Sequence, residues 1–290
     1  MKKALVIGGS GFMGSHTADE LTRKGYQVTI FDKKMSPWLL NNQKIILGDL
    51  MNIDELKEAS KGMDYVYHFA GVADIGEAKI IPRKTINMNV IGVTNSLEAS
   101  IENKVKRFIF ASTMYVYSNQ GSFYRASKQA AETLIEAYGE QSGIEYTLLR
   151  FGSLYGPRSQ EWNGIRSFVN QIIKKGKLNY TGTGYEMREY IHVYDAARLS
   201  VEILIKKHIN SAVTITGQQL IKVDDLFSIL FEIIGKDKLV KYLNKSTLSD
   251  HYGNTPYRYS PKIAKKIVPQ EFVDLGQGLL DLVEETYRKK

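Results

Sequence analysis

The chain of 290 residues contains no cysteine, which excludes disulfides, thiolate zinc sites, iron–sulfur clusters and cysteine nucleophiles. Histidine is scarce as well, and no two of its five positions have the spacing of paired metal ligands on one helix. These positions are His16, His68, His192, His208 and His251. We therefore expect no metal site.

Long hydrophobic runs are also absent. The opening MKKALVIGG places two lysines before an apolar run, but that run ends at Gly8 after four residues. A secretory signal needs an apolar stretch of roughly 7 to 15 residues, and a membrane-spanning helix one of about 18. We expect a cytoplasmic protein with no membrane partner.

Charge of one sign is in excess, with a formal net charge of +8. Such an excess favours anionic partners, among them nucleic acid, a membrane surface or a phosphorylated small molecule. The lysines are scattered in short clusters, however, and a solvated surface accounts for most of them. Hydrophobic residues make up 43% and charged residues 24%, as in ordinary globular proteins, so fibrous and disordered chains are excluded.

Short apolar runs alternate with longer segments of helical period, a pattern typical of a parallel sheet covered by helices on both faces. We place strands near 3–8, 27–32, 44–49, 64–70, 107–112 and 146–151. Helices are expected at about 13–24, 53–60, 84–103 and 124–141. Right-handed crossovers then predict an α/β fold with a doubly wound parallel sheet.

The pattern changes after Gly156 and Pro157. A helix at 165–176, a short strand pair, a helix after IHVYDAA and amphipathic helices at about 222–235 and 271–288 indicate a smaller mixed α/β C-terminal lobe. We expect the sheet domain to span 1–157, with the chain returning to it at about 187–216. The second lobe would comprise 158–186 and 217–290.

The first strand leads directly into VIGGSGFMGSH, which places Gly8, Gly11 and Gly14 at the start of a helix. Glycine is needed at the turn, where the backbone approaches a pyrophosphate, and where the helix packs against the sheet. The anion then binds the amides of the helix N-terminus. This context, more than the glycines alone, predicts a dinucleotide site.

The second strand ends at Asp32, 18 residues after Gly14. A carboxylate there accepts hydrogen bonds from the adenosine ribose and repels a 2′-phosphate, which favours NAD. A solvated loop aspartate is the alternative. Lys33 and Lys34 could instead attract a 2′-phosphate, so NADP also stays open.

Tyr124 and Lys128 are four residues apart at the start of a helical segment, so their side chains lie on one face. A phenol has a pKa near 10 and must lose about 3 units, worth about 4 kcal/mol, to act as a base at neutral pH. A neighbouring ammonium favours that loss. A surface Tyr–Lys pair without a catalytic role is the alternative.

Ser112 and Thr113 end the preceding strand, at the carboxyl edge where open α/β sheets bind ligands. A hydroxyl there can hydrogen-bond the substrate oxygen that loses its proton. Tyr115 and Tyr117 follow with strand-like alternation and are expected to line the pocket. We therefore predict Tyr124 as the reactive phenol.

Several further segments complete the pattern: GDL at 48–50, HFAG at 68–71, NVIGVTNSLEAS at 89–100, LRFGSLYGPR at 149–158 and REYIHVYDAA at 188–197. Together with the glycine motif, Asp32 and the Tyr124–Lys128 pair, they resemble the extended short-chain dehydrogenase/reductases over nearly the whole chain. The resemblance is specifically to the NAD-dependent epimerase/dehydratase family acting on nucleotide sugars.

The resemblance implies a Rossmann domain that binds NAD. Its cofactor site would comprise Gly8, Gly11, Phe12, Met13, Gly14, Asp32, Asp49, Leu50, Ala70 and Lys128. Within that set, the glycines would hold the phosphates, Asp32 the ribose, and Asp49 with Leu50 the surroundings of the adenine.

For the chemistry, the resemblance implies that Tyr124 is the base and that Lys128 also binds the cofactor ribose. Ser112 and Thr113 would contact the substrate, and Arg188 would grip the diphosphate of a nucleotide sugar with its planar fork of donors. It further implies a homodimer formed through the helices at about 84–103 and 124–141.

Two departures from the family pattern narrow the reaction. Dehydratases and decarboxylating relatives carry acidic residues just after the catalytic threonine, whereas this chain has Met114 and Tyr115, which disfavours 4,6-dehydration and decarboxylation. Thr113 precedes Tyr124 by eleven residues, about half the usual spacing, so the pocket is expected to be more open.

We expect hydride transfer from a ring carbon of a nucleotide sugar, C4 by preference, while Tyr124 removes the hydroxyl proton. Return of the hydride to the opposite face would make a 4-epimerase, which is the favoured activity, and release of the keto sugar a dehydrogenase. An NADPH-dependent reductase of a non-nucleotide carbonyl stays an alternative. A dinucleotide-sensing or nucleic-acid-binding protein is disfavoured because Tyr124 and Lys128 are both present.

Overall fold

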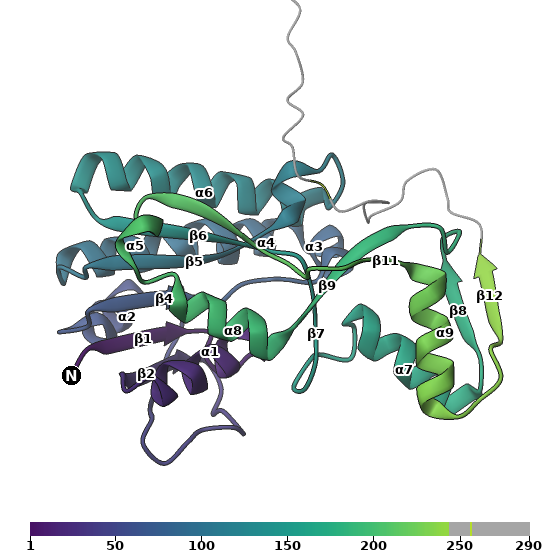
Figure 1. Ribbon diagram of the computed structural model, residues 1–290. Helices are drawn as coiled ribbons and strands as arrows, with labels where there is room; N and C mark the ends of the chain where they lie inside the picture. Colours follow the sequence, from purple (N-terminus) through teal and green to yellow (C-terminus); the bar gives the residue numbers. More distant parts are fainter. Residues whose placement is uncertain (244–255, 257–290) are drawn as a thin grey trace, which may run out of the picture. The chain divides into compact units, whose positions relative to one another are not determined.

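Seven parallel strands form the central sheet of the computed structural model (Figure 1), which describes residues 1–243 and 256. In spatial order they are β10 (Ser211–Ile215), β6 (Glu145–Phe151), β5 (Arg107–Thr113), β4 (Tyr65–His68), β1 (Lys3–Ile7), β2 (Gln27–Asp32) and β3 (Lys44–Leu47). Every neighbouring pair is parallel, so the predicted doubly wound sheet is confirmed. The helix expected at 271–288 lies outside the described residues.

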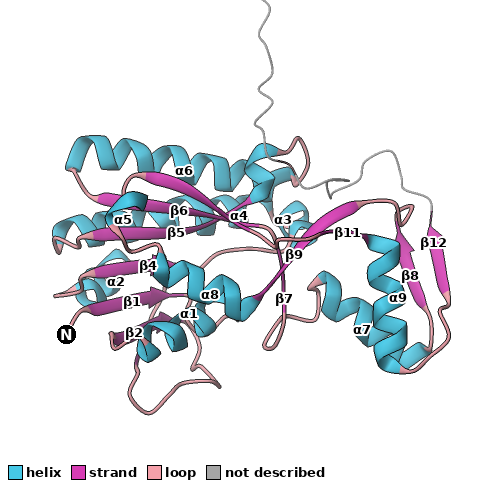
Figure 2. Ribbon diagram, in the orientation of Figure 1, coloured by secondary structure: helices cyan, strands magenta, loops and turns pink. Residues whose placement is uncertain are grey.

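The strands alternate their side chains between two cores. Along β1, Ala4 and Val6 pack into one core with α1 (Phe12–Arg23) and α8 (Val193–Glu202). Leu5 and Ile7 pack into the other, with α2 (Ile53–Ser60), α5 (Gly92–Glu102) and α6 (Ser122–Ser142). An apolar run buried on both faces is what a central parallel strand requires. Figure 2 shows the helices against both faces of the sheet.

Two small sheets follow in the C-terminal part of the described chain. One joins β11 (Leu220–Lys222), β9 (Met187–His192) and β7 (Ser153–Tyr155), and the other joins β12 (Val240–Leu243) and β8 (Leu178–Thr181). They accompany α7 (Gly164–Lys175) and α9 (Val223–Ile234), whose apolar faces enclose a third core around Phe227. β10 returns the chain to the central sheet beside β6.

The helix expected at 84–103 differs in detail from the structure. It begins as α4 (Pro82–Ile86), continues as a π-helical turn (Asn87–Ile91) and resumes as α5. The buried side chain of Asn89 accepts a hydrogen bond from the Val72 amide at 2.7 Å and donates to its carbonyl at 2.9 Å. Asn89 thus lies within the π-helical turn and bonds the backbone of a neighbouring loop, as is common where a helix departs from the regular α form. A short helix, α3 (Ile75–Ile80), precedes it and was not predicted.

No helix among residues 1–243 combines the length and the apolar composition that crossing a bilayer requires.

Candidate active site

A cavity of about 580 Å³ opens at the carboxyl ends of β1, β2 and β5. All but two of the predicted site residues line it: Gly8, Gly11, Phe12, Met13, Gly14, Asp32, Leu50, Ala70, Ser112, Thr113, Tyr124 and Lys128. The two exceptions are Asp49 and Arg188. This volume lies in the range of small-molecule and cofactor sites.

The glycine loop leaves room for a ligand at one end of this cavity. Gly8 has a φ of +80°, and a Cβ there would lie 2.5 Å from the Ala70 amide nitrogen. A Cβ on Gly14 would lie 2.2 Å from the Gly8 carbonyl oxygen. Gly11 caps α1 without a side-chain hydrogen bond, so the first amides of that helix stay available to an anion. These residues fit a dinucleotide pyrophosphate.

Asp32 ends β2 with its carboxylate turned to the glycine loop. Its two oxygens accept hydrogen bonds from the amides of Ser10, at 3.0 Å, and Lys34, at 3.2 Å. The neighbouring Lys33 ammonium lies 3.0 Å from Asp49. The Met51 amide and this ammonium hold the pKa of the Asp49 carboxyl below its ordinary value. Asp49 therefore does not line the cavity itself, but its ion-pair partner Lys33 does.

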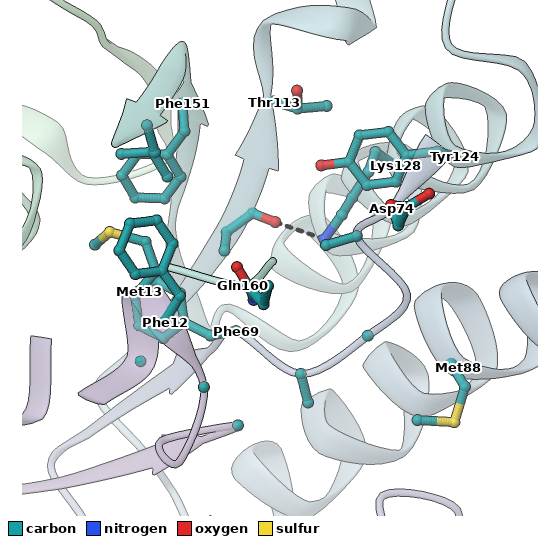
Figure 3. A pocket seen from close by; sticks show the side chains of 18 of the residues that line it. Phe12, Met13, Phe69, Asp74, Met88, Thr113, Tyr124, Lys128, Phe151 and Gln160 are labelled. Carbon is teal, nitrogen blue, oxygen red and sulfur yellow. Dashed lines mark hydrogen bonds between the residues drawn. The ribbon is translucent and has the colours of Figure 1, made fainter. Parts of the chain in front are cut away.

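Tyr124 and Lys128 project from the first turns of α6 into the cavity (Figure 3). The Lys128 side chain is 5% exposed, lies 4.5 Å above the Phe110 ring and donates to the Ala111 carbonyl at 2.7 Å. Burial lowers the pKa of Lys128 to about 8, and the charge of Glu132 opposes that fall. Most of the Lys128 population is therefore protonated at neutral pH, one helical turn from the Tyr124 phenol.

A short turn after β5 places Tyr115 beside Tyr124. Strand-like alternation of Tyr115 and Tyr117 was expected, and this is wrong, because Met114–Tyr117 form a 3-10 turn. Thr113 caps that turn, since its hydroxyl oxygen accepts from the Tyr115 amide at 3.2 Å. Tyr115 lines the cavity with its ring edge-on to Tyr124, at a centroid distance of 6.2 Å, whereas Tyr117 lies outside.

Ser112 and Arg188 have surroundings that the sequence did not indicate. The Ser112 hydroxyl, although it borders the cavity, donates to Glu132 of α6. Arg188 lies in β9, opposite Ile221 of β11. Burial raises the pKa of the nearby Tyr180, and the charge of Arg188 opposes that rise. Arg188 thus belongs to the C-terminal sheets and stands apart from the cavity wall.

Residues that the sequence did not single out complete the wall. Phe69 and Phe151 lie near Phe12 on the side of the cavity opposite Tyr124, with the Phe69 and Phe151 rings tilted by 34° and their centroids 6.4 Å apart (Figure 3). Gln160, Trp162 and Asn163 come from the segment that leads into α7. Asn89 is also buried and donates to Ser127, the neighbour of Lys128, at 3.0 Å.

The histidines near the site have structural surroundings. His68 is fully buried with its Nδ1 3.2 Å from the Ser96 hydroxyl, and burial lowers its pKa to about 3, so it stays neutral. His16 contacts the Pro157 carbonyl at 3.0 Å, and His192 caps α8. These contacts are those of core-packing and helix-capping residues.

Residues 4–215 match the sequence profile of the NAD dependent epimerase/dehydratase family. The chain belongs to this family. The matched segment ends with β10, the last strand of the central sheet. The family is NAD-dependent, so the prediction of NAD as the cofactor is confirmed.

Relatives in the family carry different activities. UDP-glucuronic acid decarboxylase 1 of Xenopus tropicalis is 25% identical over 91% of this chain, which spans 66% of that relative's length. A putative UDP-glucose 4-epimerase of Methanocaldococcus jannaschii is 29% identical, with 80% and 82% of the two chains covered. The crystal structure of a Thermotoga maritima UDP-glucose 4-epimerase with UDP-glucose superposes with a TM-score of 0.81 at 26% identity, covering 89% and 90%.

Proposed function

We propose that this protein is a nucleotide-sugar 4-epimerase that oxidises its substrate at C4 and reduces it again from the other face. One observation carries the proposal: Tyr124 and the buried Lys128 line the same cavity as the glycine loop and Asp32. A proton acceptor and a dinucleotide cradle at one sheet edge suit reversible oxidation of an alcohol. The named epimerases among its relatives support the substrate class.

NAD, when bound here, would accept a hydride from the sugar and return it. Tyr124 would take the proton of the C4 hydroxyl as a phenolate, for which its pKa must fall by about 3 units from its ordinary value. The Lys128 ammonium stabilises that phenolate electrostatically. Thr113 would hydrogen-bond the same substrate oxygen, since its hydroxyl borders the cavity beside Tyr115.

Dehydration and decarboxylation are disfavoured by the two residues after Thr113. Met114 is fully buried in the core, and Tyr115 presents a phenol where an acid would be needed. A 4-dehydrogenase that releases the keto sugar uses the same residues and is the second candidate. An NADPH-dependent carbonyl reductase is disfavoured because the Asp32 carboxylate would repel a 2′-phosphate.

Our proposal extends to binding and assembly. Arg188 of β9 does not line the cavity, so it would bind the diphosphate only of a substrate that extends beyond the cavity wall. Asp49 would act on the adenine end of the site through its ion pair with Lys33. The protein would work in the cytoplasm as a homodimer, without nucleic-acid or membrane partners.

The Tyr124→Phe variant tests the proposal. Removing only the phenolic oxygen should lower kcat by at least about 10²-fold while NAD binding persists, because loss of a general base costs this much. The wild type would be screened with UDP-, GDP-, dTDP- and CDP-sugars for the C4 epimer by NMR and for absorbance of reduced nicotinamide. Tyr115→Phe removes a second phenol from the same cavity and should keep most of the turnover.

Three outcomes would contradict the assignment. Near-normal turnover by Tyr124→Phe would exclude this residue as the base. Accumulation of reduced nicotinamide with a keto sugar would identify the dehydrogenase instead. Salt-sensitive DNA retention with no turnover on any nucleotide sugar would favour the non-catalytic alternative.

A further inference from the structure

A buried ion pair between Glu132 and Arg150 lies one helical turn beyond Lys128 on α6. Arg150 of β6 donates to both carboxylate oxygens of Glu132 of α6, from Nε at 3.0 Å and from Nη2 at 2.6 Å. The Glu132 and Arg150 side chains are 8% and 18% exposed. Such bidentate pairs are the strong and directional ones among charge-assisted hydrogen bonds. Neither residue lines the cavity, so the pair has no direct access to a ligand there.

This pair joins three of the elements around the site, β5, β6 and α6. Ser112 of β5 donates its hydroxyl to Glu132, and Arg150 donates to the Tyr117 hydroxyl at 2.5 Å. Ser112 and Arg150 are opposite each other in the β5–β6 register. The carboxylate of Glu132 thus holds the end of β5 against α6. These two elements flank the segment from Thr113 to Tyr124.

Glu132 also stands in line with the reactive pair. Tyr124, Lys128 and Glu132 follow one another at intervals of four residues on α6, so they share one face of the helix. In a low-dielectric interior, a carboxylate one turn away favours the charged form of an amine.

The groups that Lys128 contacts on β5 are uncharged, while the Asp74 carboxylate, the N-cap of α3, also lines the cavity and accepts from the Glu77 amide. β5 contributes the Ala111 carbonyl and the Phe110 ring, β4 contributes the neutral His68, and α6 contributes Tyr124. Among the described residues, Glu132 is the carboxylate that acts on the Lys128 ammonium, and it shares its charge with Arg150.

We propose that Glu132 is a positioning residue for the Tyr124–Lys128 pair, which ties β5 and β6 to α6 and balances the Lys128 ammonium inside the fold. The catalytic part of this inference rests on the proposed function. Without Glu132, Lys128 would lose its proton at lower pH, and a neutral amine no longer favours the Tyr124 phenolate.

The direct test follows the Lys128 titration by NMR of protein labelled with ¹³C at the lysine ε-carbons, without substrate. The signal is assigned as the one missing from Lys128→Met. In Glu132→Gln, which keeps the shape but removes the charge, we expect the pKa of Lys128 to fall by at least about one unit, as for loss of one nearby opposite charge. Glu140→Gln, two turns further along α6 and exposed to solvent, is the matched control and should leave it unchanged.

A second measurement uses catalysis. The alkaline limb of the kcat/KM profile should move to lower pH in Glu132→Gln by the same amount as the Lys128 titration, which a general loss of packing would not produce. Glu132→Asp keeps the charge but shortens the side chain, so it should preserve the titration and lower kcat. It also serves if Glu132→Gln does not fold.

Unchanged Lys128 titration in Glu132→Gln would overturn the inference, as would a Glu132→Asp variant in which Lys128 titrates at lower pH. A wild-type protein that turns over no nucleotide sugar would instead contradict the proposed function. It would leave the NMR result intact, because that titration needs no substrate. The two failures are therefore distinguishable.

Discussion

Lys128 and His68 are neighbouring bases that the same physical cause drives to different charge states. Burial disfavours the charged form of both and lowers the pKa of Lys128 to about 8 and that of His68 to about 3. Because amines start near 10.5 and imidazoles near 6.5, the first stays mostly protonated at neutral pH and the second neutral. Residue type thus decides which of two buried bases can stabilise a phenolate.

His68 should make the fold sensitive to acid. Its pKa is lower in the folded protein than in the unfolded chain, so the unfolded chain takes up a proton first as the pH falls. Stability is fully present above about pH 6.5 and is lost progressively towards about pH 3. Between about pH 7 and about pH 5 this one group should remove about 2 kcal/mol of unfolding free energy.

The measurement is urea unfolding of the wild type and of His68→Phe at both pH values. The replacement keeps an aromatic ring beside Phe108 and Phe110, and Ser96 keeps its own hydrogen bond to the Gly92 carbonyl. We expect the acid loss to shrink by about 2 kcal/mol in this variant. A control at the partly exposed His208, replaced by Asn, should retain the acid loss of the wild type. Equal acid losses in His68→Phe and wild type would contradict the prediction.

At the scale of elements, periodicity predicted six of the seven strands of the central sheet, all but β10, and the start of α1, because buried parallel strands and a glycine turn leave local signals. It did not predict the π-helical turn at Asn87–Ile91 or the 3-10 turn at Met114–Tyr117. Both depend on hydrogen bonds that involve specific side chains, those of Asn89 and Thr113, and hydrophobic patterns carry no record of them.

The tight contact between the glycine loop and α1 gives an element-scale prediction. A methyl group on Gly14 would meet the Gly8 carbonyl at 2.2 Å, so Gly14→Ala must push the helix away from the loop. The amides of the helix N-terminus then shift from the anion that they bind. We expect NAD affinity, measured by isothermal titration calorimetry, to fall by at least about tenfold, or roughly 1.4 kcal/mol.

Gly164→Ala is the matched control for this prediction. Gly164 is also in the first turn of a helix, α7, and also lines the cavity, but a Cβ there has nothing within 4 Å. Its NAD affinity should stay within about threefold of the wild type, which is below 1 kcal/mol. Far-UV circular dichroism separates loss of the cofactor from loss of the fold. Equal NAD affinities of Gly14→Ala and Gly164→Ala would show that the glycine loop does not form part of the cofactor site.

At the scale of the whole molecule, all but two of the site residues predicted from the sequence line one cavity, but the sequence did not indicate which contacts hold them there. The residues of the glycine motif, Asp32 and Tyr124 fall next to strand ends or helix starts, where α/β folds gather their ligands. Phe69, Phe151 and Trp162 were not singled out, because an aromatic residue in an apolar pattern looks the same whether it faces a core or a cavity. The Glu132–Arg150 pair depended on the β5–β6 register, which only the folded chain fixes.

Assembly is the last property argued at this scale. The helices proposed to pair two copies leave large apolar side chains in solvent: Ile86 is 37% exposed, Ile91 44% and Phe123, at the start of α6, 44%. Burying them would stabilise a dimer, whereas a charge placed among them would have to be desolvated. Ile91→Glu should therefore lower the molar mass measured by light scattering from that of a dimer to that of a monomer. Ile205 is also an exposed isoleucine, at 56%, but it lies outside these helices, so Ile205→Glu should leave the dimer intact. A wild type that is already monomeric, or a dimer that survives Ile91→Glu, would show that this face does not join two copies.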